Sequence, residues 1–211
     1  MWLLLPLAFA ETPLPSFEDE LSREVEARVE ALFAAGKPEE ALAASRRFRE
    51  SITDTPHLAY LDGLVLNRAG RLDEAEAAYR RSIAQSALLP EAWYDLGELL
   101  LVRGAFVEAG EAFAHATRLY PVGREAWRSP LRQAEVAGYL RQPEAMEAHL
   151  KVALARGFSF RDIEGVAHWQ QFYADPLLRD ALRKLLTVYS TPDTLESLVP
   201  LHRRLGGELN K

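Results

Sequence analysis

Residues 90–121 read PEAWYDLGELLLVRGAFVEAGEAFAHATRLYP, and this stretch decides the fold. Its first half carries Trp93, Leu96 and Leu100 at spacings of three and four, which puts them on one face of a helix. Gly104 follows that face and permits the turn that ends the helix. The stretch therefore predicts a helix, a tight turn and a second helix that returns along the first.

The second half of the same stretch fits a helix packed against the first. Gly97 and Ala109 are small at places where the two helices must approach closely, and Phe113 fills the wider gap beside them. Pro121 blocks continuation of the second helix, because proline lacks the backbone N–H and its ring clashes with the preceding turn.

The pattern recurs with a fixed period. Glycine stands every 34 residues, at Gly36, Gly70, Gly104 and Gly138. Alanine follows the first three glycines by five residues, at Ala41, Ala75 and Ala109, and Trp93 and Trp127 are also 34 residues apart. In period and in residue types the chain resembles the tetratricopeptide-repeat family, whose unit is a pair of antiparallel helices.

The resemblance implies an all-α fold, a right-handed solenoid of about four helix–turn–helix repeats closed by a C-terminal helical cap. We expect the array to occupy residues 16–157, with a first helix that begins near Ser16. The expected units are 22–55, 56–89, 90–123 and 124–157, and the expected capping segment is 158–211.

The fourth unit departs from the pattern. Trp127 and Gly138 keep the 34-residue register, but Pro130 falls inside the expected first helix. We expect a kink there, or a delayed helix start with Ser129 as the cap and Pro130 at the first helical position. Since Pro143 resembles the helix-opening Pro38, we expect a longer turn after Gly138.

Beyond Gly157 the period fails, and residues 158–173 are the most aromatic segment of the chain. We expect a helix from Pro176 to about Val188 with an apolar stripe, and a last helix after Thr191-Pro192. The stripe is Leu177, Leu178, Leu182 and Leu186. An open solenoid end exposes an apolar face, so this tail is interpreted as a cap. The alternative is a ligand pocket lined by Phe160, Trp169 and Tyr173.

Composition disfavours several functional classes. The net charge of -6 argues against a nucleic-acid surface, and cysteine is absent. The five histidines show no close metal-ligand spacing, and no glycine-rich phosphate loop or nucleophile elbow occurs. We therefore expect no cofactor, no metal and no catalysis, which would require Asp95, Glu98 and His168 to converge.

The first ten residues, MWLLLPLAFA, are uncharged and apolar and end in small residues. They are too short to span a bilayer and resemble a signal peptide. We expect a bacterial protein that is periplasmic or secreted. An incidental apolar tail on a cytoplasmic protein is the alternative.

The resemblance also places the first helix of each unit on a concave groove. The candidate partner-binding residues on this face are Tyr60, Leu64, Asn67, Arg68, Tyr94, Asp95, Glu98, Arg128 and Arg132, with Leu101 and Glu135 beside them. Family members that hold a C-terminal carboxylate use a Lys and an Asn one turn apart. Here Tyr60 with Leu64, and Tyr94 with Glu98, take those places, so that clamp is missing.

The expected function is a non-catalytic scaffold or assembly factor that binds a partner polypeptide in the groove, as a monomer or weak oligomer. Tyr and Arg are favoured residue types at protein interfaces. Two alternatives stay open: Tyr60 and Tyr94 pack between neighbouring repeats, or the aromatic segment binds a small molecule or glycan.

Overall fold

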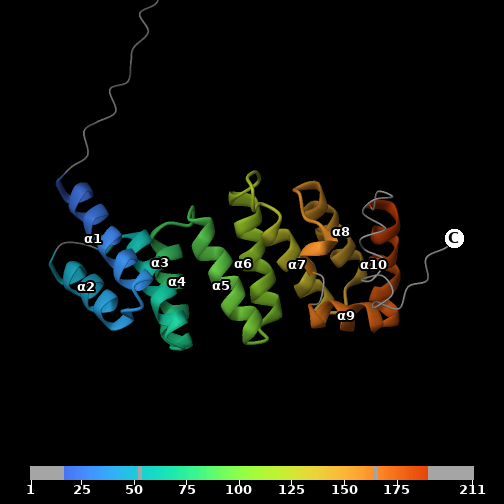
Figure 1. The fold of residues 1–211 in the computed structure, drawn as a ribbon, viewed down its shortest axis with the longest axis horizontal. Coiled ribbons are helices and arrows are strands. Elements are labelled where there is room, and N and C mark those ends of the chain that lie inside the picture. The colour runs from blue at the N-terminus through green and yellow to red at the C-terminus, as the bar shows by residue number, and fades with distance from the viewer. Residues whose placement is uncertain (1–16, 52–53, 164–165, 190–211) are drawn as a thin grey trace, which may run out of the picture.

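The computed structural model describes residues 17–51, 54–163 and 166–189, and in these ranges the chain is all helical (Figure 1). The four pairs of the array are α1 (Phe17–Ala34) and α2 (Pro38–Ser51), α3 (Pro56–Arg68) and α4 (Leu72–Gln85), α5 (Pro90–Val102) and α6 (Phe106–Leu119), and α7 (Arg128–Tyr139) and α8 (Pro143–Ala155). The tail adds the 3-10 helix η1 (Phe160–Ile163), α9 (Ala167–Ala174) and α10 (Pro176–Tyr189). The predicted all-α solenoid is confirmed.

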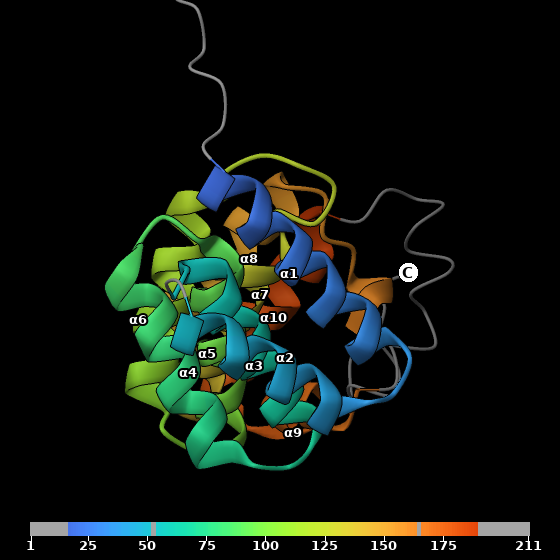
Figure 2. The ribbon, with the colours of Figure 1, turned by 90° about the vertical axis from the view of Figure 1, so that its left-hand side faces the viewer.

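The helices form two layers along the long axis, as Figure 1 shows from the side and Figure 2 from the N-terminal end. From α1 to α8, each helix packs on the next one in the chain. In the odd-numbered layer, α1 also contacts α3, and α3 contacts α5, whereas α2, α4 and α6 lie farther from one another. The stack therefore curves, and the odd-numbered helices line its inner, concave side.

The turn inside each unit has one geometry. Three residues separate α1 from α2, α3 from α4, and α5 from α6. The middle residues are Gly36, Gly70 and Gly104, with φ of 73°, 74° and 75°, a left-handed conformation that glycine adopts without steric cost. The backbone N–H of Gly70 bonds the carbonyl of Asn67 at 3.0 Å, which closes the end of α3.

Small residues set the distance between paired helices. A Cβ added to Gly97 would lie 2.7 Å from the ring of Phe113, and one added to Gly63 would lie 2.4 Å from the ring of Tyr79. Both rings are fully buried. The aromatic ring of the second helix thus lies directly on the glycine of the first, as the sequence predicts.

The prediction that the turn of the fourth unit begins at Gly138 is wrong. Gly138 lies inside α7, and the left-handed residue of this unit is Arg141, with φ of 55°. The turn from Leu140 to Gln142 has the same three-residue length as the others. A Cβ on Gly138 would lie 2.7 Å from the ring of Phe172, so the glycine serves contact with the C-terminal tail.

The shift arises in the connection before α7, which runs over residues 120–127, whereas residues 86–89 connect α4 to α5. Trp127 is the N-cap of α7, while Trp93 lies within α5. The two tryptophans were expected to hold equivalent positions, and they do not. Pro130 is the third residue of α7, where backbone N–H groups have no acceptor within the helix. The helix therefore starts late, but its N-cap is Trp127 rather than the expected Ser129, and Pro130 does not hold the first helical position.

The tail continues the two layers. Helix α9 packs on α7, and α10 packs on both α8 and α9. Buried Phe158, Phe160, Trp169, Phe172 and Tyr173 form one apolar cluster with Met146, Leu150 and Ala153 of α8 and with the leucines of α10. These contacts cover the apolar face of the last pair, which is the role of a cap.

One member of the predicted stripe is misplaced. Leu177 is 49% exposed, and Leu185 is buried along with Leu178, Leu182 and Leu186. The expected signal peptide and the helix after Thr191-Pro192 lie outside the described residues.

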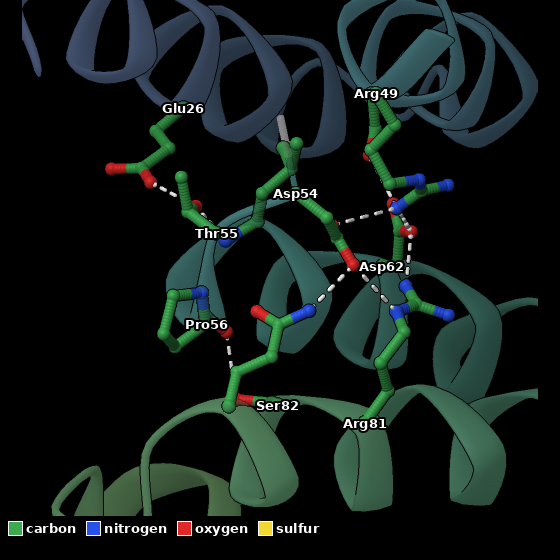
Figure 3. Close-up of polar contacts among 11 residues, drawn as sticks. Glu26, Arg49, Asp54, Thr55, Pro56, Asp62, Arg81 and Ser82 are labelled. Atoms are coloured by element: carbon green, nitrogen blue, oxygen red, sulfur yellow. Dashed lines mark hydrogen bonds and ion pairs between the residues drawn. The ribbon is translucent and has the colours of Figure 1, made fainter. Parts of the chain in front are cut away.

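A buried ion cluster joins the first two units (Figure 3). Asp62 of α3 is 3% exposed and pairs with Arg49 of α2 and with Arg81 of α4, the latter at 3.0 Å. Asp54 lies 3.0 Å from Arg81 and accepts a hydrogen bond from Gln85 at 2.7 Å. Two carboxylates face two guanidinium groups, so the cluster is charge-balanced and structural.

Candidate functional site

A pocket of about 290 Å³ lies where the odd-numbered layer is loosest. Helices α5 and α7 approach each other less closely than α3 and α5 do, because of the long connection over residues 120–127. The pocket is lined by Tyr60, Pro90, Glu91, Tyr94, Asp95, Ala116, Tyr120, Glu125, Arg128 and Ser129.

Asp95 and Tyr60 join α5 to α3 at this pocket. The Tyr60 hydroxyl donates a hydrogen bond of 2.8 Å to Asp95 Oδ2. Burial, together with the nearby carboxylates Glu98 and Glu91, raises the pKa of Asp95 to about 6, although the Tyr60 bond opposes the shift. Burial and Asp95 also raise the pKa of Tyr60 far above its ordinary value.

Tyr94 forms a second aromatic wall. Its ring meets the Phe113 ring edge-on at 5.6 Å between centroids, and Phe113 fixes it against α6. Burial and the carboxylate of Glu98 raise the pKa of Tyr94 to about 12, so its hydroxyl is a neutral hydrogen-bonding group at physiological pH.

The connection over residues 120–127 supplies the outer wall. One guanidinium nitrogen of Arg156 donates to the carbonyls of Thr117, Tyr120 and Ala126 at 3.2, 3.4 and 3.4 Å. The Tyr120 hydroxyl lies over Gly123, where an added Cβ would be 2.4 Å away. The end of α8 therefore holds this wall in place.

A chain of charges runs beside the pocket. Arg132 of α7 bonds Glu98 of α5 at 2.5 Å and Glu135 at 2.6 Å. Glu135 is 2% exposed and also accepts from the Trp169 indole N–H at 3.1 Å, with a ring nitrogen of His168 at the same distance. Against the opposing effect of burial, His168 and Arg132 hold the pKa of Glu135 below its ordinary value. The guanidinium of Arg132 is thus fully engaged within the chain.

The structure brings four of the predicted partner-binding residues to the pocket: Tyr60, Tyr94, Asp95 and Arg128. Arg128 lies on the rim and pairs with Glu125 at 3.0 Å. The other five, Leu64, Asn67, Arg68, Glu98 and Arg132, do not line it. Leu64 packs on the core, and the Arg68 guanidinium lies 5.0 Å from the centre of the Phe33 ring.

Sequence reasoning missed Glu91, Tyr120 and Glu125. Glu91 follows the helix-opening Pro90, and the other two lie near or beyond the end of the third unit. A delayed helix start at Pro130 implies a longer connection there, but it gives no sign that the side chains of this connection line a pocket with α5.

Asp95 and Glu98 lie near each other on α5, whereas His168 lies away from both, next to Glu135. Glu98 and His168 lie at opposite ends of the charge chain through Arg132 and Glu135, while Asp95 bonds Tyr60. In the described part of the chain, no group of three or more His, Asp or Glu side chains could hold a metal ion. Nor is any described helix both long and apolar enough to cross a membrane.

Comparison with known proteins agrees with this architecture. A sequence model of the tetratricopeptide repeat matches residues 26–90 and 60–124. No curated protein shows significant sequence similarity to the chain.

Several solved structures share the fold. PilF of Pseudomonas aeruginosa is 18% identical, with a TM-score of 0.60 over 92% of this chain and 96% of that one. MamA from Desulfovibrio magneticus is 17% identical, with a TM-score of 0.62 over 89% and 97%. A thermophilic TPR protein of Thermus thermophilus is 17% identical, with a TM-score of 0.53 over 87% and 96%. The matched repeats, the glycine turns and the stacked pairs identify residues 26–124 as a tetratricopeptide-repeat array, and the solved structures show that the described chain shares the fold of such proteins.

Proposed function

We propose that this protein is a scaffold or assembly factor that binds a segment of a partner polypeptide at the α3–α5–α7 pocket on its concave face. The repeat fold is one that serves protein–protein interaction, and no catalytic family is indicated. The observation that carries the proposal is an open pocket in which two half-buried tyrosines and a carboxylate converge from separate repeats.

The exposed rim of the pocket supports a peptide segment as its occupant. The pocket volume of about 290 Å³ lies at the lower end of the range of ligand sites, roughly 300–1,000 Å³. Its rim residues Glu91, Tyr120 and Arg128 are exposed, so an occupant could extend along the surface. Leu88 and Val122, in the two neighbouring connections, are 77% and 78% exposed and offer further apolar contact.

The aromatic tail supports a cap more than a ligand site. Trp169 and Tyr173 are 1% exposed and Phe160 is 4% exposed, and all three lie in the cluster that covers α8. Rings buried in this way have no surface left for a glycan or small molecule.

The proposal can be tested by site-specific crosslinking in the native organism. A photoreactive phenylalanine analogue replaces Tyr120 on the pocket rim, and a matched variant carries it at Val107, which is 64% exposed and lines a separate cavity between α6, α7 and α8. We expect one defined protein to be crosslinked from position 120, and not from position 107. Adding Tyr94→Ala should abolish that crosslink.

Equal crosslinking of that protein from both positions, or a crosslink at position 120 that persists with Tyr94→Ala, would contradict binding at the pocket. Thermal unfolding of the Tyr94→Ala chain serves as the control that the repeats remain folded.

We further propose that the protein is exported, from the apolar stretch at residues 1–10. A fusion of residues 1–20 to a reporter that is active only outside the cytoplasm should give activity. A silent fusion that is nonetheless produced would rule out export by this segment.

A further inference from the structure

The charges that line the pocket do not balance. Glu91, Asp95 and Glu125 face a single guanidinium, that of Arg128, and Arg128 is already paired with Glu125. Among the described residues Asp95 has only the Tyr60 hydroxyl as partner, and Glu91 has no ion pair. This differs from the cluster around Asp62, where each carboxylate meets a guanidinium.

The walls around these carboxylates are aromatic. Tyr60, Tyr94 and Tyr120 all line the same cavity, and the first two belong to neighbouring repeats. The face of a tyrosine ring attracts a cation within about 6 Å of its centroid, and an aromatic wall also accepts the alkyl part of a long basic side chain.

Resting on the proposed function, we infer that the pocket accepts one basic side chain of the partner segment, arginine or lysine, whose cationic group lies between Asp95 and Glu91 against the tyrosine rings. Such a group supplies the charge that the pocket lacks. An acidic side chain would meet two uncompensated carboxylates, and an apolar one would leave Asp95 in a dry site with no counter-charge.

The state of Asp95 agrees with this assignment. Burial and neighbouring carboxylates raise its pKa to about 6, so the folded chain holds the negative charge of Asp95 at a cost in free energy. A bound cation would relieve that cost. Exchange of Asp95 for the isosteric asparagine should therefore weaken binding without disturbing the pocket's shape.

The test uses three capped tripeptides as probes, Gly-Arg-Gly, Gly-Lys-Gly and Gly-citrulline-Gly, titrated into the full chain at fixed ionic strength. Citrulline keeps the size of arginine without its charge. Backbone amide shifts in 90–95 and 120–129 report on the pocket. We expect saturable shifts there with the arginine or the lysine peptide, and at least fivefold weaker binding of the citrulline peptide.

We expect Asp95→Asn to weaken binding of the arginine or lysine peptide about tenfold. Glu91→Gln should weaken it about threefold. Glu111→Gln, an exposed glutamate at the separate cavity between α6, α7 and α8, should leave it unchanged. If the basic and citrulline peptides bind alike, if none binds at the pocket, or if Asp95→Asn binds as well as the parent, the inference is overturned. A Tyr120 crosslink that depends on Tyr94 but not on Asp95 would leave the proposed function standing and overturn the basic anchor alone.

Discussion

Asp95→Asn should make the folded protein more stable at neutral pH while it weakens binding of a basic peptide. The pKa of Asp95 in the fold is about 6, against an ordinary value of 3.8. A pKa raised by folding means that the ionised form is disfavoured in the folded state, with about 1.36 kcal/mol for each unit. The difference between the two pKa values gives an upper bound of roughly 3 kcal/mol on the stability gained by Asp95→Asn. Solvent reaches part of the side chain, so we expect a gain of about 1 kcal/mol at pH 7.5.

The pH dependence follows from the same shift. Below pH 3.8 Asp95 is protonated in both states and costs nothing, and the cost grows as the pH rises toward 6 and stays constant above it. Urea unfolding of Asp95→Asn and the parent chain should therefore show the full gain in the free energy of unfolding at pH 7.5 and a smaller gain at pH 4.5. Destabilisation of Asp95→Asn at pH 7.5, or an equal gain at both pH values, would show that folding does not raise the pKa of Asp95.

Three further predictions concern the fold that holds the site. Gly97→Ala should lower the free energy of unfolding by about 1–3 kcal/mol because its methyl group meets the Phe113 ring. Adding Phe113→Leu should restore part of the lost stability. An unchanged urea midpoint in Gly97→Ala would contradict that packing. Glu135→Gln should lower the free energy of unfolding by roughly 3 kcal/mol, because it breaks the buried ion pair with Arg132. The exposed Glu111→Gln should lower it by less than about 0.5 kcal/mol. Because folding lowers the pKa of Glu135, its stabilisation should be present above the unfolded pKa and be lost as the pH falls through the folded value. Deletion of 158–211 should expose Met146 and Leu150 and give an aggregating array in light scattering, whereas a soluble truncation that unfolds cooperatively would rule out the cap.

Local rules were enough to predict most of the fold. Gly36, Gly70 and Gly104 stand where the backbone needs a positive φ, so their spacing locates three turns directly. Gly138 continues that spacing for a different reason, contact with Phe172. The turn itself falls on Arg141, because the insertion between Pro121 and Pro130 displaces the whole fourth unit. The period alone cannot distinguish a turn glycine from a packing glycine. The position of Pro143 can, because it stands two residues after Arg141, as Pro38 stands two residues after Gly36.

The residues of the candidate site also differ in how far the repeat predicts them. Tyr60, Tyr94 and Asp95 were predictable because a helix face repeats regularly, and the register of the second and third units is intact. Tyr120 and Glu125 come from an aperiodic connection, whose path depends on Arg156, the residue that follows α8. Arg132 was expected to face a partner, but Glu98 and the buried Glu135 surround it, and Glu135 bonds residues of the tail beyond the repeats. Glu98 and Arg132, like Glu135 and Trp169, are 34 residues apart, but the repeat spacing alone does not show that these side chains bond to each other rather than to a partner.

Hydrogen–deuterium exchange of the protein with and without the partner captured at position 120 tests the central claim most directly, namely that the partner segment lies on the concave pocket. We expect slower amide exchange in residues 90–95 and 120–129 on binding, with no change in α8 on the outer layer. Protection confined to α4, α6 and α8, with the pocket segments unchanged, would contradict the account.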